Sequence, residues 1–266
     1  MVVETTRLLS VYDFGHQLLE INDLDPVYVL LWEAKLAQDQ LHKWLLAYWC
    51  YYHVGTASWC VDQRDYWVAM TTVAGSKDYP RAHERRHFRG ASALKSVAWL
   101  KTRGIETLFE PLVGKEWQLE QLIKYVSTWY QFGKWIAFKV ADMLERLGLA
   151  KVDFKTGADH LFDSPRRGAE LLWSQERGTE VPSGVTQWAI DRVLTKLNPA
   201  KSPPRYERLL NAQEAETIIC KFKSYRGGHY HIGEDVTACR TGLLRFARCP
   251  TSQELLRAGR RGGLWQ

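Results

Sequence analysis

The feature that most constrains this fold is an apolar repeat of three and four residues. It is clearest between Asp25 and about Tyr52, where the repeating positions are Val29, Leu30, Trp32, Leu36, Leu41, Trp44, Leu45, Tyr48 and Trp49. This spacing gives a helix one apolar face, whereas a half-buried strand would alternate every second residue. Strand-like alternation is scarce throughout, so the sequence predicts a mainly α fold.

The repeat and its interruptions predict where the helices lie. Asp25-Pro26 is typical of a helix start, because proline is tolerated in the first turn. We expect a variable start over 1–24 with one short helix, then one or two helices to about Tyr52. We expect a break at Gly55-Thr56-Ala57 and a loop over 75–80. Further helices are expected over 58–73, 91–101, 116–130, 135–147, 185–197 and 211–220.

Length and composition indicate a globular protein. The 266 residues are 45% hydrophobic and 25% charged, which suits a folded chain rather than a disordered one. We predict one domain over 1–266, with possible lobes of about 1–110 and 111–266. The richest apolar run, 44–52, is too short to span a bilayer, and no secretory signal is visible, so we expect no membrane partner and a cytoplasmic location. Five cysteines without a CxxC pair predict free thiols.

Charge and aromatic content favour an anionic partner. The formal net charge is +6, and the chain contains 12 tryptophans, whose rings serve both core packing and base stacking.

The most basic segment is RAHERRHFR at 81–89. It contains His83-Glu84-Arg85-Arg86-His87, which fits the HExxH pattern of zinc proteases. Ala93 stands at the third-ligand position of the extended pattern and cannot bind metal, and the arginines would repel a dication. A solvated basic helix is a second interpretation. We favour a third, a binding site for phosphate or pyrophosphate.

A second pattern is a helix, a tight turn at Gly133 and another helix. The turn amides of a helix-hairpin-helix would bind a nucleic-acid phosphate, and Ala137 and Ala141 suit close packing of the second helix. An ordinary pair of antiparallel helices would give the same spacing. Asp153 lies twenty residues after Gly133 in a Val-Asp pair, which resembles the helix-hairpin-helix DNA glycosylases and their active-site aspartate. Their lysine nucleophile would fall at Trp135, so lyase chemistry at that position is not expected.

The third region is CKFKSYRGGHYHIGED at 220–235. Cys220, His229 and His231 fit no common zinc spacing. Lys221, Lys223, Tyr225 and Arg226 suit contacts with a DNA backbone or a diphosphate better.

Four segments together resemble one family. They are YHVGTA at 52–57, PRAHERRHFRG at 80–90, FGKWIAFKVADML at 132–144 and the 220–235 segment. They are similar to the bacteriophage α-glutamyl/putrescinyl thymine pyrophosphorylases, also called amino acid:DNA transferases, over roughly residues 40–240. The resemblance implies a helix-hairpin-helix DNA glycosylase-like fold. The helical domain of phage hydroxymethyluracil DNA kinases is also similar, but this chain lacks their P-loop.

The resemblance also implies a reaction. Double-stranded DNA carrying 5-(pyrophosphoryloxymethyl)uracil would be the substrate, and a free amino acid (glycine or glutamate) or a polyamine would displace pyrophosphate. No metal or cofactor is needed, because arginines can neutralise the leaving group. The work would be done in the cytoplasm of an infected host.

The residues implied fall into three groups. Asp153, with Asp142 as a second candidate, would be the catalytic base. The pyrophosphate-binding set is Arg81, Arg85, Arg86, His87 and Arg89. The set that contacts DNA or a flipped base is Gly133, Lys134, Trp135, Lys221, Tyr225, Arg226, His229 and Tyr230.

Three other functions stay open. A DNA glycosylase would share the hairpin and Asp153 and release a free base. A non-catalytic DNA-binding module would explain the charge and the hairpin. A zinc metallopeptidase would use His83 and His87.

Overall fold

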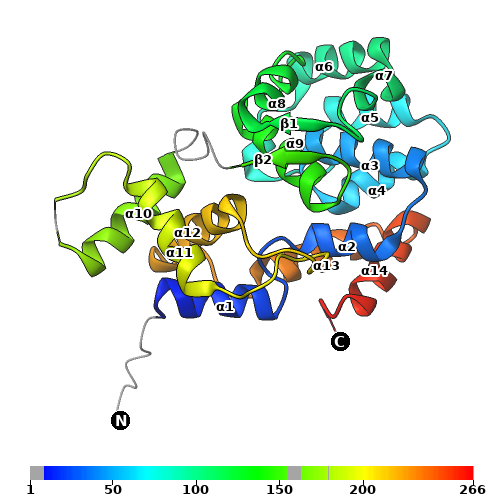
Figure 1. The fold of residues 1–266 in the computed structure, drawn as a ribbon. Helices are drawn as coiled ribbons and strands as arrows, with labels where there is room; N and C mark the ends of the chain where they lie inside the picture. Colours follow the sequence, from blue (N-terminus) through cyan, green and yellow to red (C-terminus); the bar gives the residue numbers. More distant parts are fainter. Residues whose placement is uncertain (1–8, 155–162, 179, 266) are drawn as a thin grey trace. The chain divides into compact units, whose positions relative to one another are not determined.

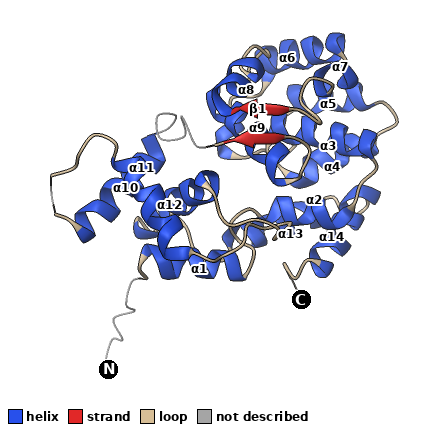
Figure 2. Ribbon diagram, in the orientation of Figure 1, coloured by secondary structure: helices blue, strands red, loops and turns tan. Residues whose placement is uncertain are grey.

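The computed structural model describes residues 9–154, 163–178 and 180–265 (Figure 1). Among these residues there are fourteen α-helices, one short 3₁₀ helix and two three-residue strands (Figure 2). The predicted mainly α fold is confirmed. No described helix combines the length and the apolar character that a membrane crossing requires.

The chain forms two compact units, and each is assembled from two separate stretches. Unit 1 comprises 1–24 and 154–235, and unit 2 comprises 25–153 and 236–266. The lobe boundary expected near residue 110 therefore falls inside unit 2. That the whole chain is one domain stays a prediction.

Unit 1 is organised around one long helix, α12 (Ala212–Arg226). The helices that pack against it are α1 (Val11–Glu20), α10 (Asp163–Glu176) and α11 (Val185–Leu197). A capping box begins α12: Asn211 caps the first turn while the Glu214 carboxylate accepts a hydrogen bond from the Asn211 main-chain N–H at 2.7 Å. The Ser202 hydroxyl also donates to the buried Glu214 carboxylate at 2.6 Å, so this side chain stabilises the start of α12.

Unit 2 contains the remaining elements. In chain order they are α2 (Pro26–Ala34), α3 (Gln38–Tyr51), α4 (Val54–Asp62), α5 (Tyr66–Gly75), η1 (His83–Arg85), α6 (Gly90–Arg103), α7 (Ile105–Phe109), β1 (Glu116–Gln118), α8 (Leu119–Val126), α9 (Lys134–Arg146), β2 (Lys151–Asp153), α13 (Glu234–Leu244, whose first two residues belong to unit 1) and α14 (Pro250–Arg261). α3 is buried continuously from Trp44 to Tyr51 and forms the centre of the core. α8 and α9 pack as a hairpin, and the strands before and after it, β1 and β2, pair in parallel.

The predicted break at 55–57 is wrong, and the reason is close packing. α3 ends at Tyr51, its C-cap Tyr52 adopts a left-handed conformation with φ 52°, and Gly55 lies inside α4. A Cβ on Gly55 would come within 2.1 Å of the Gly242 carbonyl oxygen. The glycine therefore permits contact between α4 and α13 and does not end a helix.

Other boundaries also differ from the sequence prediction. The helix expected over 58–73 is divided near Asp65, whose side chain caps α5. The helix expected over 116–130 begins as β1 and becomes helical only at Leu119. The basic segment 81–89 is η1 followed by turns, so the interpretation as a basic helix is wrong.

Candidate active site

One face of α9 carries four side chains suited to chemistry. Trp135, Lys139, Asp142 and Arg146 are separated by four, three and four residues, which places them on the same side of the helix. At the outer end, Trp135 meets Tyr52 edge to face with 4.9 Å between ring centroids. The structure thus brings together two residues predicted separately, Trp135 and Asp142.

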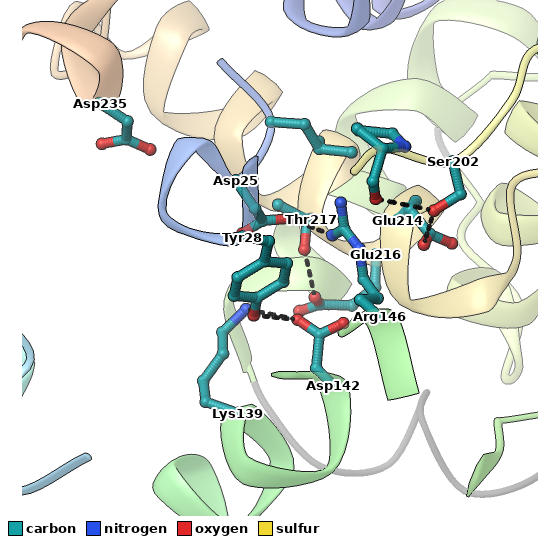
Figure 3. Close-up of polar contacts among 12 residues, drawn as sticks. Asp25, Tyr28, Lys139, Asp142, Arg146, Ser202, Glu214, Glu216, Thr217 and Asp235 are labelled. Atoms are coloured by element: carbon teal, nitrogen blue, oxygen red, sulfur yellow. Dashed lines mark hydrogen bonds and ion pairs between the residues drawn. The ribbon is translucent and has the colours of Figure 1, made fainter. Parts of the chain in front are cut away.

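Asp142 is fully buried on this face (Figure 3). Its Oδ2 accepts a hydrogen bond from the Tyr28 hydroxyl at 2.7 Å and lies 3.8 Å from the Lys139 ammonium nitrogen. Its Oδ1 has no hydrogen-bond partner. Burial raises the pKa of Asp142 to about 6, although Lys139, Arg146 and the Tyr28 hydrogen bond each favour the charged form.

Arg146 and Asp25 extend the cluster. The buried Arg146 guanidinium pairs with Asp25 and lies over the Tyr28 ring, 4.6 Å from its centroid. Tyr28 is held from both sides, and burial raises its pKa well above the ordinary value, so it stays a hydrogen-bond donor. Asp142 is therefore a carboxyl with one oxygen fixed by Tyr28 and one buried oxygen without a hydrogen-bond partner. Its pKa near neutrality suits a general base.

The hairpin between α8 and α9 presents an open turn. Gly133 is the N-cap of α9, is exposed, and has nothing within 4 Å of where a Cβ would lie. No side chain caps α9, and Lys134 is exposed beside Gly133. The first turn of α9 therefore offers main-chain N–H groups and a positive charge at one place, as phosphate binding requires.

The turn is held in place by Arg85. This side chain is only 7% exposed and donates to the Cys50 carbonyl at 2.9 Å and to the Gln131 carbonyl at 3.1 Å. The guanidinium lies over Phe88 and Phe132 at 4.4 and 5.4 Å. Burial lowers its pKa to about 10, so the group stays charged at neutral pH. Arg85 joins the end of α3 to the hairpin turn, and one nitrogen, Nη2, is buried without a partner.

Arg81 is engaged in a similar way. It donates to the carbonyls of Phe88, Val73 and Ser76, the last two at 2.8 and 3.0 Å. Arg81 and Arg85 thus donate to main-chain oxygens, while Arg81 Nε and Arg85 Nη2 are buried without a hydrogen-bond partner; their predicted role in pyrophosphate binding stays a prediction. Their positive charge still contributes to the local field.

Other basic residues of the segment are more exposed. Arg86 and His87 are exposed and Arg89 is half-buried at the start of α6. No described carboxylate pairs with any of the four arginines between 81 and 89. His83 and His87 do not share an α-helical face, because only His83–Arg85 form a 3₁₀ turn. Within the described residues, no cluster of three or more histidine, cysteine or acidic side chains could hold a metal.

In the 220–235 segment, Lys221 and Tyr230 are tied to the N-terminal stretch of unit 1. Lys221 donates to the Asp23 and Leu24 carbonyls at 2.5 and 2.7 Å and pairs with Asp235 at 2.6 Å. The Tyr230 hydroxyl donates to the buried Asp23 carboxylate at 2.5 Å. These two side chains therefore have structural contacts, and their predicted role in DNA binding stays untested.

Tyr225 is likewise packed inside unit 1. It stacks on Phe14 with 5.0 Å between ring centroids. Arg226 and His229 are exposed, and the Arg226 guanidinium lies 5.9 Å from the Phe222 ring centroid. They are the members of the predicted DNA-binding set in unit 1 that face solvent.

Asp153 ends β2 and is half-buried, paired in register with Gln118 of β1. The structure therefore places it at the base of the helical hairpin. Its role as base stays a prediction.

Comparison with known proteins decides the family. Residues 24–231 match the family described as amino acid:DNA transferase. The chain belongs to the amino acid:DNA transferase family. It is 34% identical over 269 residues to a glycinyltransferase from Pseudomonas phage PaMx11, covering 90% of this chain and 92% of that protein. It is 26% identical over 248 residues to a putrescinyltransferase from Delftia phage PhiW-14, covering 89% and 78%.

Membership in the amino acid:DNA transferase family confirms the predicted resemblance and the prediction of a transferase. The glycosylase-like architecture stays a prediction. Sequence reasoning missed the residues around Asp142, namely Asp25, Tyr28, Tyr52, Lys139 and Arg146. The spacing of 135, 139, 142 and 146 on one predicted helix was the signal that could have found two of them.

Proposed function

We propose that this transferase joins an amine to 5-(pyrophosphoryloxymethyl)uracil in DNA. The amine nitrogen forms a bond to the exocyclic methylene carbon, and the carbon–oxygen bond to pyrophosphate breaks. Pyrophosphate leaves with the electron pair. The observation that carries the proposal is the buried Asp142 carboxyl with one unpartnered oxygen, in a member of the amino acid:DNA transferase family.

The incoming amine explains why a carboxyl with a raised pKa is useful. A free amino acid or polyamine is an ammonium ion at neutral pH and must lose a proton before it can attack. Asp142 Oδ1 accepts that proton, while Tyr28 holds Oδ2. A base whose pKa lies near the working pH is best matched to this task. Asp153 is the alternative base.

The leaving group requires positive charge, and the 81–89 segment supplies it. Arg86, His87 and Arg89 contact the pyrophosphate, while Arg81 and Arg85 order the segment and add to its field. Stabilising charge that develops in the transition state is the largest contribution in many enzymes.

The DNA duplex is held by the hairpin at Gly133 and Lys134, and Trp135 stacks on the flipped base. The exposed Arg226 and His229 are further candidates for contacts with DNA. We place this activity in the cytoplasm of the infected host, where phage DNA is modified.

Among possible donors we propose glycine. The chain is 34% identical to a glycinyltransferase and 26% identical to a putrescinyltransferase, and it covers more of the former protein.

The test is nucleoside analysis by mass spectrometry. Pyrophosphorylated hydroxymethyluracil DNA is incubated with the protein and, separately, with glycine, glutamate or putrescine. A new nucleoside whose mass equals the aminomethyl-linked uracil of glycine supports the proposal. A product with another amine retains the reaction and corrects the donor. Loss of the modified base without a new nucleoside indicates a glycosylase instead, and unchanged DNA with every amine refutes the transfer reaction.

The catalytic base is identified by parallel variants. Asp142→Asn and Asp153→Asn are compared in the same assay, with Arg86→Gln as a pyrophosphate-site variant. Loss of at least about 100-fold in kcat with Asp142→Asn, at unchanged DNA affinity, is the result expected of a general base. If Asp153→Asn shows that loss and Asp142→Asn does not, the assignment is reversed.

A further inference from the structure

Most of the net positive charge lies in the last 31 residues. Val236 to Gln266 contains six arginines and one glutamate, whereas the other 235 residues contain 30 lysines and arginines against 29 acidic residues. This segment lies outside residues 24–231, which match the family. Its charge therefore points to a property that the family match does not assign.

Three of these arginines are exposed on α13 or in the turn after it. Arg240 lies in α13, and Arg245 and Arg248 follow its last residue, Leu244. The opposite face is buried through Cys239, Gly242 and Leu243. Gly242 packs against α4, so α13 has a fixed orientation within unit 2. We call Arg240, Arg245 and Arg248 the α13 arginine face.

This face carries uncompensated charge. No described carboxylate pairs with Arg240, Arg245 or Arg248, and no acidic residue lies between Val236 and Cys249. In contrast, Arg257 and Arg261 of α14 both pair with Glu254, at 2.8 and 2.7 Å. Like charges held on one face repel each other, and a polyanion that binds them removes that cost.

The α13 arginine face adjoins the loop that leads into the basic segment. Arg245 donates to the Asp78 carbonyl at 3.0 Å, and Phe246 stacks parallel to Tyr79 with 6.5 Å between centroids. Pro80 and Arg81 follow directly.

We propose that the α13 arginine face binds DNA phosphates that flank the modified nucleotide. The inference rests on the proposed function for its partner, a DNA duplex. It adds a binding surface away from the reacting base, which acts on duplex affinity and not on the chemical step.

The test is the salt dependence of DNA binding. A variant with Arg240→Gln, Arg245→Gln and Arg248→Gln is titrated onto an unmodified duplex of about 30 base pairs, by fluorescence anisotropy at several salt concentrations. Each lost phosphate contact lowers the slope of log Kd against log salt by about 0.9, so a decrease of about 2 to 3 is expected. Arg257→Gln with Arg261→Gln is the matched control and should leave the slope unchanged.

Two further measurements separate the possible failures. Single variants Arg240→Gln and Arg248→Gln, expected to lower the slope by about 0.9 each, remain informative if the triple variant does not fold. Turnover on a modified duplex of about 10 base pairs, which lacks the flanking phosphates, should be the same for wild type and triple variant.

Equal slopes for wild type and triple variant would overturn the inference even if transfer activity is present. A control that lowers the slope as much as the triple variant would overturn it too, because the effect would then be one of net charge. If the triple variant instead loses binding to RNA or to anionic lipid vesicles at an unchanged DNA slope, the face serves another polyanion and the inference is wrong. Absence of transfer by wild type on any amine would refute the proposed function separately.

Discussion

Replacing Asp142 with asparagine should stabilise the folded protein at neutral pH while removing activity. Burial raises the pKa of Asp142 to about 6, whereas an unfolded aspartate ionises at about 3.9. Because the pKa of Asp142 is higher in the folded protein, protonated Asp142 contributes to the free energy of unfolding, and this contribution is fully present below about pH 4. It is lost as the pH rises to about 6 and stays lost above it. The difference of about 2 pKa units corresponds to roughly 3 kcal/mol.

Asparagine accepts the Tyr28 hydrogen bond without becoming charged. The stability advantage of Asp142→Asn over wild type should therefore grow by about 2 kcal/mol between pH 4 and pH 7, since the unfolded aspartate is already half ionised at pH 4. The assay is denaturant unfolding of both proteins across that range, since effects of other titrating groups cancel in the difference. Asp39→Asn, at an exposed acid on α3, is the control and should show no such growth. An advantage that is independent of pH would refute the claim that Asp142 is hard to ionise in the folded protein.

Three further results are expected. In wild type, kcat/KM for transfer should rise with pH to a plateau with a midpoint near pH 6. Tyr28→Phe should move that midpoint upward, because it removes a hydrogen bond that favours charged Asp142. A pH profile of transfer measures both results, and a midpoint that moves downward in the variant would contradict the assignment. Arg85→Met should cost about 2 kcal/mol in urea unfolding, because the buried Cys50 carbonyl and the Gln131 carbonyl lose their donor. An unchanged midpoint would show that the hairpin turn does not need Arg85. Gly55→Ala should destabilise the folded protein by about 3 kcal/mol, because the added Cβ clashes with the α13 backbone, whereas Gly133→Ala should leave the thermal midpoint unchanged. Equal thermal midpoints for the two variants would refute the packing argument.

The fold could be predicted where one apolar stripe dominates. The observed bounds of α11 and α6 agree closely with the predicted ranges 185–197 and 91–101. The apolar spacing of an amphipathic helix indicates which face is buried, and a glycine ends α6. α13 was not predicted, because its apolar face is narrow and relies on Gly242 and on its contact with α4. Such packing depends on residues almost 190 positions away in the chain.

The site could be predicted only in part, for a similar reason. The sequence identifies Asp142 and Trp135 by residue type, but it cannot show that a tyrosine on α2 reaches across to fix one carboxylate oxygen. Nor can it show that Arg81 and Arg85 donate to main-chain carbonyls of distant turns. Long-range hydrogen bonds leave no local pattern in the chain.

The way the two units share the chain has a consequence for synthesis. The stretch 25–153 of unit 2 is made before most of unit 1, yet the α14 helix that packs on α2 and α4 is made only after the last residue of unit 1. In unit 1, α1 packs against α11 and α12, so its packing partners are made only after most of unit 2. The helices of unit 1 can therefore assemble before unit 2 is complete. Until α14 is made, the apolar surfaces of α2 and α4 that it covers stay exposed. Such surfaces favour aggregation during folding, so yield on expression should depend on how quickly α14 follows.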